Sequence, residues 1–216
     1  MVVRKINNHG QAKLFRSQYI EFLTKTNPLV IWAIYLPVLT MMPYYSLKYL
    51  ALSVTKITLV FLSGVFFWTF TEYILHRFAF HHKPKTATGR KINYLLHGNH
   101  HQYPRDKKRL FMPALPSVII ASGFFFLFNW ILEKYAFTFF PGFMFGYLVY
   151  GSMHYAIHTW KPPFKWMKPL WRNHHLHHYK DGGLGFGVSS TLWDHVFGTM
   201  YDFKNEKWKT SRSNMN

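Results

Sequence analysis

Four long runs without a charged side chain are the feature that most constrains this chain. They cover residues 28–46, 57–71, 113–132 and 136–157, and the second continues in a helical pattern to residue 80. An apolar helix of about 20 residues crosses the hydrocarbon core of a bilayer. Runs of this extent leave too little polar chain to cover them in a soluble protein. They predict an all-α integral membrane protein with four transmembrane helices.

The basic residues are separated from the apolar runs. The net charge is +18 although 49% of the residues are hydrophobic. Of the 26 lysines and arginines, 23 lie in residues 1–27, 76–110, 159–180 and 201–216. Because basic loops face the cytosol, we expect both termini to be cytosolic, in a bacterial inner membrane or the endoplasmic reticulum depending on the organism. Basic charge also suits nucleic acid, but the apolar runs favour a membrane partner and no nucleic acid.

The supply of metal ligands is restricted. The chain has no cysteine, and its eight aspartates and glutamates are scattered. Disulfides and thiolate metal sites are therefore excluded, and a carboxylate-bridged metal site is not indicated. A metal ion here must be held by nitrogen or oxygen.

Ten of the 14 histidines fall into four spaced motifs, and all of them are expected at the cytosolic face. The motifs have the patterns HxxxxH, HxxHH, HxxxH and HxxHH. They comprise His76, His81, His97, His100, His101, His154, His158, His174, His177 and His178.

Helical spacing predicts how these imidazoles meet. Residues three and four positions apart share one helix face, so we expect each HxxHH motif to converge on one centre. His76 and His81 can share a metal only if their helix ends or bends between them. The first five and last five histidines then form halves that face each other. Ten nitrogens divide as about five per ion, which predicts a histidine-rich helical cap holding a di-metal site.

The expected metal is iron. Imidazole suits iron, zinc, copper and nickel, but structural zinc prefers four ligands, whereas five histidines and an open position suit dioxygen chemistry on iron. Zinc is able to replace iron in purified protein. Glu72 lies four residues before His76, so its carboxylate is a candidate to accept the second N–H of that imidazole.

The motif set resembles that of the membrane fatty acid hydroxylase superfamily. Three segments more specifically resemble fatty acid 2-hydroxylases: EYILHRFAFH at 72–81, LLHGNHHQYPRDKKRLFMP at 95–113 and GFGVSSTLWDHVFGT at 185–199. The resemblance divides the chain into a basic cytosolic N-terminal segment (1–27), a membrane fatty acid hydroxylase domain (28–200) and a basic polar tail (201–216).

The resemblance implies a di-iron monooxygenase that uses dioxygen to hydroxylate the carbon next to an acyl carbonyl. The substrate would be a free fatty acid or the acyl chain of a ceramide-type sphingolipid. No haem domain precedes the first span, so we expect electrons from a separate cytochrome b type protein or ferredoxin with an NAD(P)H reductase. The alternatives are a sterol or carotenoid desaturase or hydroxylase, and a non-enzymatic membrane metal carrier.

Four further residues are expected around the metal ligands rather than among them. We expect Asp194, with Trp193, to close over the histidines, and Glu72 to orient a ligand. His175 and His195 fall outside the spacing pattern, which predicts supporting or surface positions for both.

Overall fold

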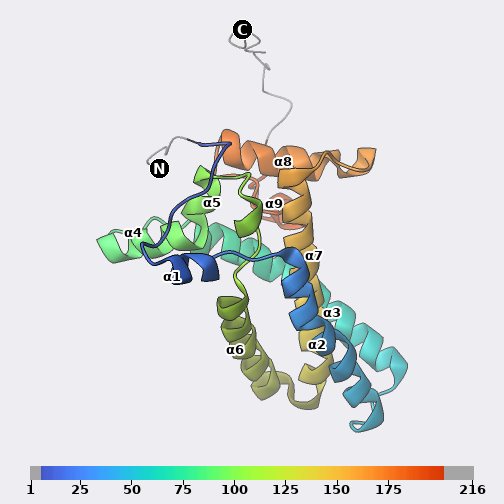
Figure 1. Cartoon of the computed structure of the whole chain (residues 1–216). Helices are drawn as coiled ribbons and strands as arrows, with labels where there is room; N and C mark the ends of the chain where they lie inside the picture. Colours follow the sequence, from blue (N-terminus) through green and yellow to red (C-terminus); the bar gives the residue numbers. More distant parts are fainter. Residues whose placement is uncertain (1–5, 202–216) are drawn as a thin grey trace.

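The computed structural model describes residues 6–201, and every regular element in this range is helical (Figure 1). Long helices extend to one end of the molecule, and the short helices other than η4 gather at the other. The long helices are α2 (Pro28–Lys48), α3 (Val54–Ile74), α6 (Ala114–Leu132) and α7 (Ala136–Thr159). The shorter elements are α1 (Gln18–Leu23), η1 (Leu75–Phe80), α4 (Ala87–Asn93), η2 (Tyr94–Gly98), α5 (Asn99–Gln102), η3 (Lys107–Arg109), η4 (Glu133–Tyr135), η5 (Lys165–Met167), α8 (Lys168–Tyr179) and α9 (Leu192–Val196). The all-α prediction is confirmed for the described residues.

Three stretches of the described chain are long and apolar enough to cross a membrane: Pro28–Lys48, Val54–Phe80 and Lys107–Thr159. The third contains both α6 and α7, which are joined by a turn where Glu133 takes a positive φ of 49°. Large apolar side chains such as Phe126 and Trp130 are exposed on α6, at 68% and 80%. Exposed apolar surface of this kind suits lipid rather than water as the surroundings, as expected for a membrane protein.

Small residues let α3 and α7 pack closely. A Cβ at Gly64 would lie 2.2 Å from the carbonyl oxygen of Phe139, and one at Gly142 would lie 2.0 Å from that of Phe61. The two backbones therefore approach each other at distances that exclude any side chain, as small residues allow in membrane helix pairs. This contact fixes the two helices whose ends carry His76 and His154.

The short helices form a cap on the long ones, and the N-terminal segment runs across this cap (Figure 1). Asn7 donates its backbone N–H to the carbonyl of Gln102 at 2.8 Å, and Thr26 donates to that of Lys108 at 2.9 Å. Residues 6–27, expected as a separate segment, therefore pack against the histidine-bearing part of the chain. The predicted tail, apart from Tyr201, lies outside the described residues.

Candidate metal centre

The ten motif histidines converge at the junction of the cap and the long helices, where they form two groups of five. In each group the five potential ligand atoms lie within 4.8 Å of one another. The first cluster is His76, His81, His97, His101 and His177. The second cluster is His100, His154, His158, His174 and His178.

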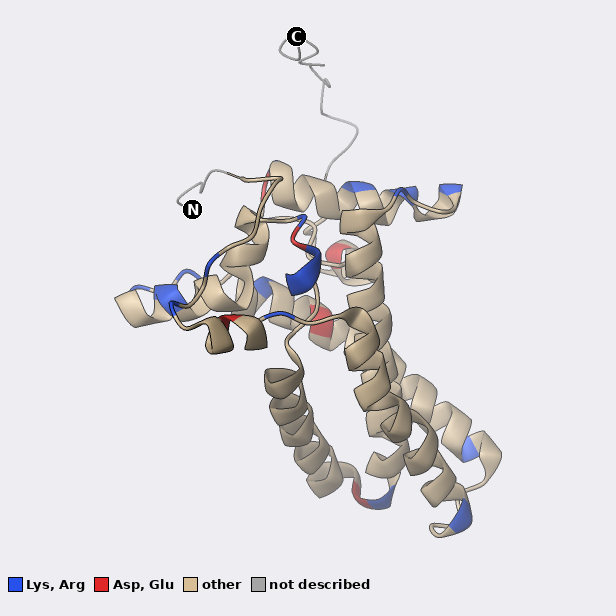
Figure 2. Cartoon of the chain, in the orientation of Figure 1, with Lys and Arg blue, Asp and Glu red and all other residues tan. Residues whose placement is uncertain are grey.

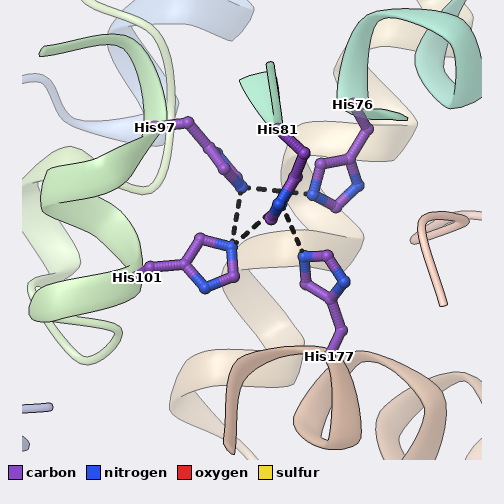
Figure 3. A group of neighbouring side chains, drawn as sticks. All are labelled: His76, His81, His97, His101 and His177. Carbon is purple, nitrogen blue, oxygen red and sulfur yellow. Dashed lines mark hydrogen bonds between the residues drawn. The ribbon is translucent and has the colours of Figure 1, made fainter. Parts of the chain in front are cut away.

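The first cluster draws on three parts of the chain, and its imidazoles point toward one another (Figure 3). All five present Nε2 to the centre. The Nε2 atom of His97 lies 3.1 Å from that of His76 and 3.0 Å from that of His101. That of His81 lies 3.2 Å from His101 and 2.9 Å from His177. The cluster is half-buried at His81 and His101 and buried at the other three positions.

The second cluster is buried at all five positions. His154 and His158 come from the end of α7, His174 and His178 from α8, and His100 from α5. The Nε2 atom of His154 lies 2.8 Å from that of His100, and the Nε2 atom of His174 lies 2.9 Å from that of His158 and 3.1 Å from that of His178.

The structure corrects the expected grouping of the histidines. Each HxxHH motif was expected to converge on one centre, but each divides between the two clusters. His100 turns away from His97 and His101 and joins the second cluster, and His177 leaves its neighbours to join the first. The two clusters are adjacent, so the histidines of one helix are divided between them.

A widened helical turn explains how His76 and His81 meet. Residues 75–80 form a π-helix, and His81, which caps it, donates its backbone N–H to the carbonyl of His76 at 3.2 Å. Because π-helical bonds join residues five apart, these two side chains come to the same side without a break in the chain. A second π-turn at residues 94–98 precedes His100 and His101. The predicted bend is therefore a change of helix type, which is common at functional sites.

Backbone carbonyls orient three of the imidazoles. The Nδ1–H of His76 donates to Phe186 at 2.5 Å, and that of His177 donates to Leu184 at 2.7 Å. In the second cluster, His154 donates to the carbonyl of Leu110 at 3.1 Å. A carbonyl only accepts, so each contact places the ring proton on Nδ1 and leaves the Nε2 lone pair facing the centre.

Asp194 and Glu72 hold the glycine-rich loop that supplies two of these carbonyls. Asp194 is fully buried and accepts the N–H groups of Phe186 and Gly187 at 2.9 and 2.8 Å. Glu72 accepts those of Val188 and Ser189 at 2.7 and 3.0 Å. The two carboxylates therefore fix the backbone behind the first cluster.

These contacts change the expected role of Glu72. Its carboxylate binds the loop, and the second nitrogen of His76 bonds the Phe186 carbonyl instead. Trp193 also differs from expectation, because its indole N–H donates to Thr69 at 3.0 Å and its ring packs on Phe70. Trp193 therefore holds α9 against α3. The position over the histidines that was expected for Trp193 is occupied by Phe186.

Phe186 was not singled out by the sequence reasoning. Its ring centroid lies 5.7, 5.5 and 5.6 Å from those of His76, His81 and His177. It covers the first cluster with an apolar ring. Phe186 and Leu110 lie in the segments that resemble the family, at 185–199 and 95–113, but the sequence gave no signal that the Phe186 ring or the Leu110 and Leu184 carbonyls would contact the histidines.

His175 and His195 lie outside both clusters. His175 is half-buried, and its ring centroid is 6.4 Å from that of His158. His195 is exposed, and its Nδ1–H donates to the carbonyl of Thr191 at 2.8 Å. Neither side chain belongs to the sets of histidines that could hold an ion.

The cap histidines are held in the neutral form. Burial, and the nearby imidazoles of His76 and His101, lower the pKa of His81 to about 2. Burial also lowers the pKa of His101 to about 4. Burial and mutual repulsion hold the pKa values of His97, His174 and His177 well below the usual range. Neutral imidazole is the form that binds metal, so ligation here requires no loss of a proton.

The donor sets fit two metal ions. With metal–nitrogen bonds of roughly 2.1 Å, two ligands at right angles have nitrogen atoms about 3 Å apart. Seven Nε2–Nε2 contacts within the two clusters measure 2.8 to 3.2 Å. Where Nδ1 carries the proton, converging Nε2 lone pairs repel one another unless a cation lies among them. Each cluster is therefore suited to one ion with five nitrogen ligands.

A cavity of about 320 Å³ leads from the histidines into the membrane part of the molecule. His97, His100 and His154 line it beside the metal centre, and Ala121 and Phe124 line it along α6. The lining is mainly apolar, with polar atoms from side chains such as Tyr150 and Ser117. Pro116 and Phe124, which also line the cavity, are eight residues apart on α6, a rise of about 12 Å. The cavity is suited to an extended hydrocarbon chain.

Comparison with known proteins identifies the family. Residues 61–199 match the model of the fatty acid hydroxylase family. The chain is 38% identical to a dihydroceramide fatty acyl 2-hydroxylase of Arabidopsis thaliana, over 87% of this chain and 79% of that protein. It is 42% identical to a ceramide very long chain fatty acid hydroxylase of Saccharomyces cerevisiae, over 88% of this chain and 50% of that protein.

A solved structure agrees with these matches. The structure of full-length Scs7p, in which only the hydroxylase domain is visible, superposes with a TM-score of 0.83 at 40% identity and covers 89% of this chain and 73% of that one. The fold and the histidine clusters define a protein of the membrane type with two sets of side chains that could each hold a metal ion. The chain belongs to the fatty acid hydroxylase family, as the motif resemblance predicted.

Proposed function

We propose that this protein is a membrane-bound di-iron monooxygenase that hydroxylates the 2-position of a lipid acyl chain. The observation that carries the proposal is a mainly apolar cavity lined at one end by three of the ten converging imidazoles, His97, His100 and His154. The relatives named as 2-hydroxylases of fatty acids and ceramides support the same reaction. The acyl chain is either free or part of a ceramide-type sphingolipid.

The residues expected to hold the two ions are the first and second clusters. When bound, the iron pair would supply the reduction of dioxygen that C–H hydroxylation requires. Asp194 and Glu72 would support the first cluster through the loop at 184–189, and His175 and His195 would remain outside the ligand set. Zinc is able to occupy the same nitrogen donors in purified protein.

The chain's own contribution is to place and enclose the substrate. The apolar walls along α6 and α7 bind the hydrocarbon tail and exclude water. Tyr150 lines the cavity with its ring parallel to that of His154, at a centroid distance of 5.9 Å. With its tail along α6 and α7, the lipid places its polar end next to the histidines. The carbons beside the carbonyl are then the ones nearest the metal ligands, which favours hydroxylation at that position.

We infer that four helices cross the membrane. Helix α6 has 19 residues and α7 has 24, so each is about 28 Å long or longer, enough to span separately. Basic residues concentrate around the cap, whereas few lie at the opposite end of the long helices (Figure 2). The charge distribution supports a cytosolic cap and cytosolic termini.

We also infer that electrons arrive from a separate acidic protein, such as a cytochrome b type protein or a ferredoxin. Lys107 and Lys108 are exposed on the cap beside α5. Positive surface of this kind attracts an acidic donor to a site close to the metals. Its other role is to hold the cap against anionic headgroups, at about 1 kcal/mol per basic residue near the surface.

Lipid mass spectrometry of a host that expresses the chain tests the proposal. Acyl species heavier by one oxygen atom should appear, and fragmentation should place the hydroxyl on carbon 2. Hydroxylated or desaturated sterols or carotenoids instead would support the alternative enzyme. Unchanged lipids with altered cellular metal would support a metal carrier, although carriers usually place their ligands at mid-membrane.

A further inference from the structure

The two histidine clusters differ in what lies behind them. In the first cluster, the Nδ1–H groups of His76 and His177 each donate to a carbonyl of the 184–189 loop. In the second cluster, His154 has a carbonyl acceptor, but the Nδ1 atoms of His174 and His178 are buried without a hydrogen-bond partner among the described residues. The first cluster has no such orphaned nitrogen in this part of the chain.

This difference matters when a cation binds. All ten imidazoles present Nε2 to a centre, so a neutral ligand carries its proton on Nδ1. At His76 and His177 that N–H already has an acceptor. At His174 and His178 the bound form buries an N–H group with none, and such a group costs free energy that ion binding must offset.

The carboxylates increase the difference. Asp194 accepts the N–H of Gly187, which belongs to the same peptide group as the Phe186 carbonyl that receives the proton of His76. This connects a buried negative charge to a metal ligand through one peptide group, an arrangement that raises ligand basicity. The carbonyl behind His154 belongs to Leu110, whose own N–H has no carboxylate acceptor among the described residues, and the nearby acids Asp106 and Glu21 are paired with Arg109 instead.

We propose that the two metal positions have unequal affinity. The first cluster is the tight site, and the second cluster is the weaker site from which a divalent transition-metal ion exchanges. A half-loaded protein therefore holds its ion among His76, His81, His97, His101 and His177. The inference rests on the metal centre of the proposed function and requires no turnover.

Equilibrium dialysis of the purified full chain in detergent tests this. The protein is dialysed against buffers that clamp free Zn²⁺, and bound zinc per chain is counted by elemental mass spectrometry. We expect two steps with midpoints about tenfold or more apart. A single step for both ions would overturn the proposal. The affinities must be measured at equilibrium rather than inferred from exchange rates. His81 and His101 are half-buried, so the first cluster is more open to solvent, and exposure alone speeds metal exchange.

Two matched variants assign the steps. His97→Ala removes one ligand of the first cluster, and His158→Ala removes one of the second. In His158→Ala the tight step should remain at its original midpoint while the weak step weakens or disappears. In His97→Ala the tight step should be lost. The reverse pattern would overturn the assignment.

Loop variants test the cause. Asp194→Asn should weaken the tight step by about 10- to 100-fold and leave the weak step in place. Glu72→Gln offers a second variant if Asp194→Asn does not fold. Asp181→Asn is the control, because Asp181 is exposed on the same segment and caps Gly183 at 2.8 Å. Unchanged midpoints of the tight step in both folded loop variants would overturn the proposed cause.

The inference and the proposed function fail separately. Equal affinities together with active lipid hydroxylation would refute this inference and leave the proposed function standing.

Discussion

His100 and His154 bring their Nε2 atoms to 2.8 Å of each other although 54 positions separate them in the chain. His100 thereby crosses from the motif at 97–101 to the cluster formed by α7 and α8. His177 makes the opposite crossing, with its Nε2 atom 2.9 Å from that of His81. Because of these two crossings, each cluster contains histidines from both halves of the chain, so neither half is able to complete a cluster alone.

The crossing histidines give the first prediction. His100→Ala and His177→Ala should each reduce hydroxylation to background, because each removes one of five ligands from a different cluster. Lipid mass spectrometry of expressing cells measures the product. His175→Ala is the matched control on the same helix as His177, and it should keep most of the activity. Equal losses for His175→Ala and His177→Ala would show that the ligand assignment on α8 is wrong.

Much of this centre was predictable from spacing, because helical spacing is local. The ten histidines, the helical class and the positions of the apolar runs follow from patterns within a few residues of each other. The division between clusters does not, because it depends on where two centres lie relative to α5 and α8. Residues three and four apart on a helix differ by enough rotation to serve two centres as readily as one.

Backbone groups and helix type were also beyond prediction. The π-turn at residues 75–80 has no residue signature, so only the need for His76 and His81 to meet hinted at a bend. Glu72 was expected to accept the second N–H of His76, but its partners include backbone N–H groups more than 100 positions away. Spacing places the Glu72 carboxylate one helical turn before His76, but it does not determine whether the carboxylate contacts that ligand or a loop distant in the sequence.

The cavity gives a second prediction, concerning chain length. Ala121 is 6% exposed and lines the cavity on α6, so Ala121→Phe should block its deeper part and shift the products toward shorter acyl chains. Overpacking is expected to cost about 1–3 kcal/mol of stability, which thermal unfolding in detergent would register.

Ile119→Phe is the matched control for the cavity variant. Ile119 lies on the same helix but is 63% exposed on its outer face, so a larger ring there should leave the product profile unchanged. The ratio of hydroxylated long-chain to very-long-chain species separates the two variants. An identical ratio in both would show that the acyl chain lies elsewhere.

The third prediction concerns Glu21, which holds the N-terminal segment to the cap through Arg109. The side chains of Arg109 and Glu21 are only 5% and 16% exposed. Glu21→Gln should release this segment and speed its cleavage by a protease by about tenfold or more, because hydrogen bonds to charged groups are among the stronger ones. Glu133→Gln, which changes an acid at the other end of the molecule, is the control.

The same contact predicts a pH dependence. Partial burial raises the pKa of Glu21, but the N–H groups of Phe15 and Leu14 and the charge of Arg109 outweigh it, so the pKa lies below its ordinary value of 4.5. A lowered pKa means that the contact stabilises the folded form fully above pH 4.5 and that this stabilisation is lost as the pH falls below that value. Proteolysis with an acid-active protease should show faster N-terminal cleavage below pH 4.5, and Glu21→Gln should abolish that change.

The last prediction links the basic cap to electron supply. If Lys107 and Lys108 help to dock an acidic donor, reversal of both to glutamate should raise the donor's apparent Michaelis constant and slow reduction at low donor concentration. Rising ionic strength should have the same effect on the unaltered protein, because salt screens exposed charges over about 10 Å at 0.1 M. Steady-state turnover with a purified soluble donor, measured across a salt series, reports both effects.

Lys48 and Lys56 provide the matched control for the charge reversal. They are also exposed, but they lie at the opposite end of α2 and α3, so reversing them makes the same change in net charge away from the cap. If docking depends on position, this pair should leave the Michaelis constant unchanged while the cap pair raises it. A similar rise in both double variants would indicate that only total charge matters. Kinetics indifferent to salt and to the cap reversal would leave Lys107 and Lys108 with only their role at the membrane surface.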